Sequence, residues 1–118
     1  MDPLRRQLTD PTGEPLLEMM NLLRLLDREV PAQVVATFFY VATHDNCHKQ
    51  AIEEDLDMTS ASASRNTDWL SKHHRLNKPG LNLIVKQKDP TNQRRITLSL
   101  TPKGRMLWKQ LKEIINGN

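Results

Sequence analysis

The sequence predicts an α+β fold that is mainly helical, with one two-stranded β-hairpin and a C-terminal helix. Two observations lead to this prediction. Apolar residues recur at helical spacing through the first half of the chain and again near its C-terminus, and two short runs between Leu81 and Thr101 alternate apolar with polar residues. Repeats of about 3.6 and 2 residues are typical of a helix packed on one face and of a half-buried strand. At 118 residues the chain has room for one domain with one modest core, which a partner subunit would enlarge.

Residues 1–13 are expected to form an N-terminal arm, and residues 14–118 the folded domain. Pro3, Pro11 and Gly13 interrupt regular structure in the arm. The first helix is expected from Glu14 to Asp27, with an apolar face made of Leu16, Met19, Met20, Leu23 and Leu26. Three further leucines widen this face beyond one stripe, so the helix is expected to touch more than its own core.

Three more helices are expected before the hairpin. Pro31 suits the first turn of the second helix, which ends near His44. A short third helix covers residues 48–57, with Ala51, Ile52 and Leu56 inward. Thr59 or Ser60 is the natural N-cap of the fourth, because a hydroxyl can accept a hydrogen bond from an otherwise unpaired backbone N–H. The narrow inward stripe of this fourth helix consists of Ala63, Thr67 and Leu70.

The β-hairpin is expected after the breaker cluster Lys78-Pro79-Gly80. Leu81, Leu83 and Val85 are expected on the inward face of its first strand, and Ile96, Leu98 and Leu100 on that of its second. The residues 89–92 between them favour a turn, since proline presets its backbone angle and Asp and Asn can bond their own turn. Thr101-Pro102 then signals the start of a last helix and Gly117 its end.

Charge is unevenly distributed along the chain, although the net charge is only +3. Residues 14–57 carry nine acids and three bases, a net charge of −6, whereas residues 59–95 carry eight bases and two acids, a net charge of +6. A basic second half suits a polyanion such as a nucleic acid. The alternative is a merely solvated basic face.

The outward faces of the fourth helix carry short polar side chains. They are Ser60, Ser62, Ser64, Arg65, Asn66 and Asp68. Short hydroxyls and one arginine permit close approach to a phosphate backbone and to base edges, which a bulky or acidic face would not. The alternative is an ordinary serine-rich surface helix.

The order of these elements, two helices joined by a tight turn and then a basic-tipped hairpin, is typical of a winged helix-turn-helix. From about Val30 to Leu111 the sequence resembles the multiple antibiotic resistance regulator (MarR) family. LDMTSASASRNTDWL, residues 56–70, resembles the turn and recognition helix, with Ser64-Arg65 at the family's Ser-Arg. DPTNQRR, residues 89–95, resembles the wing, and LSLTPKG, residues 98–104, resembles the LTxxG run that follows it.

The resemblance implies a homodimer whose recognition helices enter successive major grooves of double-stranded DNA while the wings reach adjacent minor grooves. The wing contacts are then expected at Lys86, Lys88, Asn92, Arg94 and Arg95, with phosphate contacts at Lys72, Arg75 and Lys78. A basic tip can follow a phosphate chain or enter a narrow minor groove. The alternative for the wing arginines is solvation of a hairpin end.

The terminal helices are expected to join the two subunits, because their apolar surface exceeds what one small core needs. The expected dimer interface consists of Leu16, Met19, Met20, Leu23, Trp108, Leu111 and Ile115. The chain is shorter than usual for the resembled family, with one helix after the wing, so the family's helical interface is expected only in part.

Three positions depart from the resembled pattern. Asn92 stands where many family wings have an aspartate that can pair with a wing arginine, which leaves the rigidity of the wing open. Ala63 and Thr67 replace larger aliphatic residues. Trp69 occupies a position that is often polar, and two roles are open to it, packing beside the wing or contact with DNA. Packing is favoured, because a tryptophan buries a large area.

No enzymatic or metal chemistry is expected. His44, Cys47 and His48 are of metal-ligand type but fall short of the four ligands that zinc takes, and a redox role for Cys47 would need a lowered pKa. No glycine-rich phosphate loop, nucleophile elbow or spaced carboxylate pair is present, and no cofactor is expected. The single cysteine and the absence of an apolar signal peptide or membrane span point to the cytoplasm.

The expected function is sequence-specific binding of double-stranded DNA by a dimeric transcriptional repressor that occludes a promoter. The alternative is a winged-helix protein-interaction or assembly module that uses the acidic first half and does not read DNA sequence. A small-molecule effector is compatible with the sequence but not indicated by it, and no membrane partner is expected.

Overall fold

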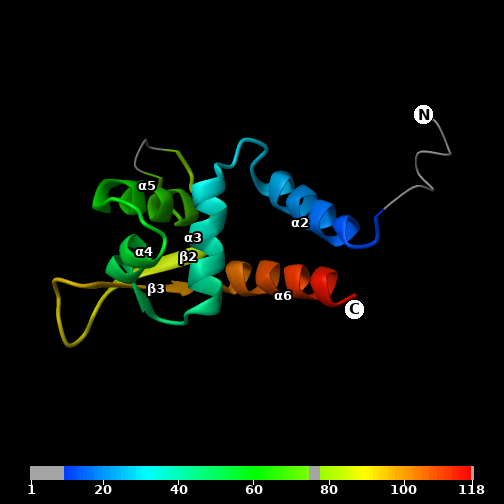
Figure 1. The fold of residues 1–118 in the computed structure, drawn as a ribbon. Helices are drawn as coiled ribbons and strands as arrows, with labels where there is room; N and C mark the ends of the chain where they lie inside the picture. Colours follow the sequence, from blue (N-terminus) through cyan, green and yellow to red (C-terminus); the bar gives the residue numbers. More distant parts are fainter. Residues whose placement is uncertain (1–9, 75–77, 118) are drawn as a thin grey trace.

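The computed structural model describes residues 10–74 and 78–117, which form five helices and three short strands. In chain order they are α2 (Gly13–Leu26), α3 (Ala32–Thr43), β1 (Cys47–His48), α4 (Lys49–Asp55), α5 (Ser60–Leu70), β2 (Ile84–Lys88), β3 (Ile96–Leu100) and α6 (Pro102–Asn116). Figure 1 shows α3 in the middle of the molecule, with α4, α5 and the β2–β3 loop on one side and α2 and α6 on the other. The predicted mainly helical α+β fold is confirmed.

The predicted helix ends agree with the structure wherever a side chain caps them. Thr59 Oγ1 accepts a hydrogen bond of 3.0 Å from the backbone N–H of Ser62, and Thr101 Oγ1 accepts one of 3.0 Å from Gly104. Pro102 stands in the first turn of α6, and Gly117 ends that helix with a left-handed φ of 73°. The start of the N-terminal arm, residues 1–9, lies outside the described residues.

Helix α3 is the centre of the core. Its Val34, Phe38 and Val41 are at most 1% exposed, and they pack in one cluster with residues of every other helix and of both longer strands. Thr37 is fully buried but satisfied, because its hydroxyl donates 2.7 Å to the Gln33 carbonyl one turn earlier. Helix α3 therefore fixes where α5 and the sheet lie.

Helix α4 is fastened to α3 by one side-chain hydrogen bond. The Tyr40 hydroxyl donates 2.6 Å to Asp55 Oδ2, and this carboxylate, more than burial, raises the pKa of Tyr40 to about 12. The phenol therefore stays protonated and keeps α4 in place at neutral pH.

The sheet has three antiparallel strands in the order β1–β3–β2, so the predicted two-stranded hairpin is present and an unpredicted third strand, β1, joins it. Cys47 and His48 pair with Leu98 and Thr97 of β3. His48 was expected at the start of a helix, but that helix begins at Lys49. A strand of two residues is too short to show an alternating pattern, so the sequence carried no signal for it.

The predicted inward face of the first hairpin strand also needs a correction. The strand begins at Ile84, and Leu83 and Ile84 are adjacent yet both 1% exposed. Asn82 has a left-handed φ of 55°, which interrupts the pleat, and the Leu83 N–H donates 2.7 Å to the Leu70 carbonyl at the end of α5. Leu83 thus belongs to a connection between α5 and the sheet, and β2 becomes more exposed from Ile84 to Lys88.

Gly104, the glycine of the LTPKG run, is required by a close backbone approach. A Cβ atom at this position would lie 2.0 Å from the Leu83 carbonyl oxygen and 3.0 Å from its carbon. The first turn of α6 therefore lies directly on the chain that leads into β2. The Thr101 N–H donates 3.0 Å to the same carbonyl and reinforces this contact.

We predict that Gly104→Ala destabilises the fold, because the clashing atoms are backbone atoms that no side-chain rotation can move. The free energy of unfolding should fall by about 1–3 kcal/mol, the usual effect of overpacking. Urea denaturation measures it. Gly13→Ala is the matched control, since the nearest atom to a Cβ there is 3.7 Å away. Equal effects of the two substitutions would contradict the prediction.

Candidate nucleic-acid interface

The exposed side of α5 is small and polar, as the sequence predicts. Ser60 and Arg65 are exposed, and Ser62 and Ser64 are half-buried. The Arg65 guanidinium donates 3.1 Å to the Ser62 hydroxyl, which holds the arginine along the outer face of the helix. The inward stripe of Ala63, Thr67 and Leu70 is confirmed, with exposures of 0%, 0% and 1%.

Asn66 was expected on the outward face, and the structure corrects this. The residue is only 8% exposed, and its amide donates 3.4 Å to Gln33 Oε1 and 3.3 Å to Met58 Sδ. The reason is helical spacing, because position 66 is three residues after Ala63 and one before Thr67, on the side that packs against α3. Asn66 therefore seats α5 on the core.

Asp68 and Lys86 lie together between α5 and β2. The Lys86 ammonium pairs with the Asp68 carboxylate, and the two side chains are 24% and 23% exposed. Both were predicted as separate contact residues of the recognition helix and the wing. The structure instead brings them together, so that part of the charge of each is neutralised by the other and the helix is tied to the wing.

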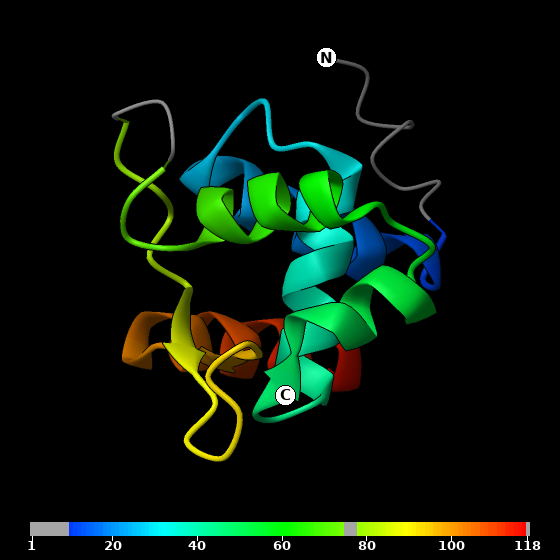
Figure 2. The ribbon, with the colours of Figure 1, turned by 90° about the vertical axis from the view of Figure 1, so that its left-hand side faces the viewer.

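The wing loop between β2 and β3 is ordered by its own side chains. Asp89 Oδ1 accepts hydrogen bonds of 2.9 Å from the Thr91 N–H and 2.8 Å from the Thr91 hydroxyl, and Asp89 Oδ2 lies 2.9 Å from His48 Nε2. These contacts, those from Thr91 foremost, lower the pKa of Asp89 to about 2. Asn92 Oδ1 accepts 3.1 Å from the Arg94 N–H. Figure 2 shows this loop near the start of α4.

The cationic residues of the wing lie at its outer end and on its return arm. Lys88, Arg94 and Arg95 are exposed, as is Asn92. Arg94 and Arg95 also border a polar recess of about 230 Å³ that reaches Lys49 of α4 and Ser60 of α5. The wing arginines and the first residue of α5 therefore line the same recess.

Lys49 is a residue of this surface that the sequence analysis missed. It is 9% exposed, and its ammonium donates 3.3 Å to both the carbonyl and the hydroxyl of Ser60 and pairs with Glu53 at 3.1 Å. It holds the start of α5 against α4. A lysine in the first turn of a short helix is usually solvated, so only the register of α4 against α5 reveals this role.

The loop after α5 is the other basic segment. Lys72 and Lys78 are exposed and border a cleft of about 470 Å³, whereas Arg75 lies outside the described residues. Gly80 closes the loop onto α5, because a Cβ there would lie 1.7 Å from the Ser71 carbonyl oxygen. The two lysines are therefore held near the C-terminal end of the candidate recognition helix.

Trp69 packs within the protein, the role favoured over DNA contact, but it does not pack beside the wing. Its Nε1–H donates 2.7 Å to Asp27 Oδ2, just after α2, and its ring meets the His74 ring edge-on at 5.0 Å. The tryptophan thus joins α5 to the connection between α2 and α3, and its polar atom is already engaged there.

The terminal helices α2 and α6 lie on the opposite side from the wing (Figure 1). Of the residues expected in a dimer interface, Leu16, Met20 and Ile115 are 55%, 44% and 50% exposed. Met19 and Trp108 are half-buried. Leu23 and Leu111 need a correction, because at 6% and 1% exposed they already belong to the core of one chain. Leu17 and Leu25, two of the leucines expected to widen the apolar face of α2, are 63% and 83% exposed.

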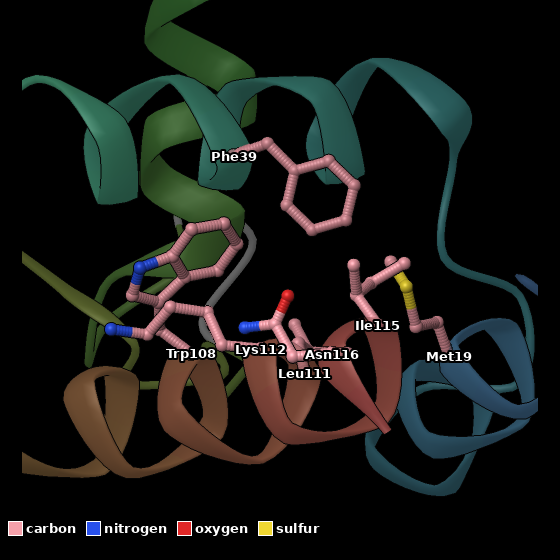
Figure 3. A pocket seen from close by; sticks show the side chains of 7 residues that line it. All are labelled: Met19, Phe39, Trp108, Leu111, Lys112, Ile115 and Asn116. Carbon is pink, nitrogen blue, oxygen red and sulfur yellow. The ribbon is translucent and has the colours of Figure 1, made fainter. Parts of the chain in front are cut away.

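An apolar pocket of about 310 Å³ opens between α2, α3 and α6. Figure 3 shows its lining, with Met19 from α2, Phe39 from α3 and Trp108, Leu111 and Ile115 from α6. Phe39 and Trp108 are in ring contact, with centroids 6.0 Å apart. The pocket continues the apolar surface of the terminal helices.

Comparison with known proteins gives structural matches. No family model and no curated protein matches the chain. The S. aureus MepR–DNA complex superposes with a TM-score of 0.71 at 19% identity, over 98% of this chain and 85% of that one. MarR superposes with a TM-score of 0.60 at 16% identity, over 92% of this chain and 77% of that one. The Streptomyces coelicolor transcriptional regulator PcaV, in complex with its natural ligand, superposes with a TM-score of 0.59 at 18% identity, over 92% of this chain and 74% of that one.

The chain has the MarR-type winged helix-turn-helix fold. In this MarR-type fold α4 and α5 form the helix-turn-helix, β2 and β3 form the wing, and β1 is the short third strand. The departure at Asn92 does not leave the wing loop without support, because Asp89, Thr91 and the Asn92 side chain itself order it.

The remaining candidates for chemistry are engaged in the fold. His44 stacks on Tyr40 with ring centroids 4.0 Å apart, and burial raises the pKa of the half-buried Cys47, which opposes thiolate formation. Among the described residues no group of three His, Cys, Asp or Glu side chains could hold a metal ion. Within the same residues no helix is long and apolar enough to cross a membrane.

We predict that the Asp89 carboxyl titrates near pH 2 and not near the ordinary 3.8. Because its pKa is lowered in the folded state, the ionised turn stabilises the fold above pH 3.8, and this stabilisation disappears as the pH falls through about 2. Carboxyl-carbon NMR measures the titration.

Thr91→Val tests the cause of this shift, because it removes the hydroxyl donor while keeping the backbone N–H. The pKa of Asp89 should rise toward its ordinary value. Thr97→Val, in β3, removes a hydroxyl that donates to Gln87 and should leave Asp89 unchanged. An unaltered Asp89 titration in Thr91→Val would show that the turn does not depend on this bond.

Proposed function

We propose that the chain is a dimeric transcriptional repressor that binds double-stranded DNA sequence-specifically and occludes a promoter. One observation carries the proposal. Helix α5 and the wing loop lie on one side of α3, and α2 and α6 lie on the other (Figures 1 and 2). Arg65, Arg94 and Arg95 are exposed on the first side, and exposed apolar residues of α2 and α6 belong to the second. One side thus suits DNA, and the other suits a second subunit.

Helix α5 is the proposed reading element. Its short hydroxyls allow the helix to approach base edges in the major groove closely, and Arg65 supplies a guanidinium that can bond a guanine at two points. Asn66 is left out of the contact set because it is buried. Among the described residues we retain Ser60, Ser62, Ser64 and Arg65 for base or phosphate contact in the major groove.

The wing and the loop after α5 are the proposed anchors. Lys88, Arg94 and Arg95 on one side of α5 and Lys72 and Lys78 on the other are all exposed. The two acids of this basic half, Asp68 and Asp89, are engaged by Lys86 and by Thr91 and His48. The surface therefore presents mainly positive charge to a duplex, which suits contacts to phosphates.

The fold supports the same proposal by comparison. The matching MepR structure is a complex with DNA, and PcaV is a transcriptional regulator. In a two-fold dimer the two α5 helices would face half-sites about one helical turn apart on a pseudo-palindrome. Assembly through the acidic first half, without reading DNA, is the competing function that the experiments below separate from this one.

A salt titration of binding to a duplex tests the proposal. Wild type should bind with log affinity falling steeply against log salt. Arg94→Ala combined with Arg95→Ala should weaken cognate and random duplexes nearly alike and flatten the slope by about 0.9 for each phosphate that is no longer neutralised. A dimer has two wings with two arginines each, so up to four phosphates are involved. Circular dichroism controls for folding.

Arg65→Ala should instead reduce discrimination between cognate and random duplexes, by about 1–3 kcal/mol for each base contact removed. A binding site selected from random DNA supplies the cognate duplex. Equal weakening on both duplexes would contradict a base-reading role for Arg65. A folded wild type without salt-dependent binding would favour the assembly module.

We predict that the chain sediments as a dimer at micromolar concentration and that Ile115→Lys shifts it toward monomer, since a charge in an apolar interface is costly. Met106→Lys is the matched control. Met106 is also exposed on α6, but nine residues at 100° each place it on the opposite face from Ile115. A wild type that sediments only as a monomer would contradict the predicted dimer.

A further inference from the structure

The polar recess beside the wing has a composition that suits one phosphate group. It lies between the return arm of the wing, the start of α4 and the start of α5, and its polar lining includes His48, Lys49, Glu53, Ser60, Arg94 and Arg95. Its volume of about 230 Å³ equals that of about eight waters at roughly 30 Å³ each, room for a phosphate with part of its hydration shell.

The charges of the recess are arranged with fixed groups at the floor and exposed ones at the rim. Lys49 is buried and held by Ser60 and Glu53, whereas Arg94 and Arg95 are exposed. No hydrogen bond or ion pair engages either guanidinium within the described part of the chain. Three cations thus face one carboxylate, and the two rim cations are available to a ligand.

A side-chain contact and strand pairing hold the segments that border the recess. His48 Nε2 lies 2.9 Å from Asp89 Oδ2, which joins the strand leading into α4 to the first residue of the wing loop. Backbone pairing of Cys47 and His48 with β3 holds the same two walls. The return arm therefore stays beside α4, and its arginines border a preformed site.

We propose that this recess seats one backbone phosphate of the bound duplex, between Arg94 and Arg95 at the rim and the α4–α5 junction at the floor. The inference rests on the proposed function and deepens it. Arg94 and Arg95 bind the phosphate, Lys49 is a positioning residue that holds Ser60, and Glu53 weakens the binding because its carboxylate repels the phosphate. The wing is thereby anchored to the DNA backbone at its return arm.

Glu53→Gln isolates this effect, because the amide keeps an oxygen acceptor for Lys49 while removing the negative charge. The variant should bind a random duplex more tightly at low salt, by about fivefold for each subunit's recess, the effect of deleting one repulsion between unit charges about 4 Å apart in water. Glu54→Gln is the matched control. It makes the same charge change at the next residue of α4, which is exposed and outside the recess, and should gain less than twofold.

Combining Glu53→Gln with Arg94→Ala and Arg95→Ala should remove most of the gain, since the phosphate is then no longer seated. Equal gains in Glu53→Gln and Glu54→Gln would overturn the recess and leave DNA binding intact, as would a gain that survives the removal of both arginines. Absent salt-dependent binding by wild type would instead overturn the proposed function itself.

A second pair of variants covers the case in which Glu53→Gln does not fold. Arg95→Ala should weaken binding to the random duplex more than Lys88→Ala does, because Lys88 is an exposed wing cation that does not line the recess. Equal weakening in these two variants would overturn the proposal. Thermal melts confirm that each variant is folded.

Discussion

The burial of α3 is the constraint on which the rest of the structure depends. One face of this helix contacts α5 and the sheet and another contacts α6, so its apolar side chains fix the positions of both sides of the molecule at once. The polar groups that this packing buries are hydrogen-bonded, Thr37 to a carbonyl of its own helix and Asn66 to Gln33 of α3. Because a close-packed interior has low compressibility, a short chain can hold an exposed helix and a hairpin at a defined spacing without a large core.

The electrostatics of the basic half follow a consistent arrangement. Acids there are used inside the fold, where Asp68 ties α5 to β2 and Asp89 shapes the wing turn, and the basic groups without such contacts lie outside. Lys86 is the cation of this half that pairs inside the fold, with Asp68, and Lys49 of the acidic half holds the first residue of α5. Long side chains at the surface lose rotamer freedom when they pair, so leaving arginines unpaired at the wing keeps them adaptable for a ligand.

Local sequence signals predicted the elements well and their contacts less well. Thr59 and Thr101 cap their helices as expected, because a cap depends on three or four neighbouring residues. The two-residue strand β1, the left-handed Asn82 and the tether from Lys49 to Ser60 depend on segments that are distant in sequence or on a single backbone angle. For the same reason the face of α5 was predicted correctly at Ala63 and Thr67 but not at Asn66, whose polar type gives no hint of partners on α3 and in the turn before α5.

The placement of the two tryptophans has a spectroscopic consequence. Trp69 lies at the end of α5 with its indole N–H bonded to Asp27, and Trp108 borders the apolar pocket between the terminal helices. The chain has no other tryptophan, so its intrinsic fluorescence divides between two reporters on opposite sides of α3. With either one replaced by phenylalanine, the emission of the other would follow a single event. Quenching or a spectral shift of Trp69 would then report a change beside α5, and the same signal from Trp108 would report a change among α2, α3 and α6. No attached dye would be needed.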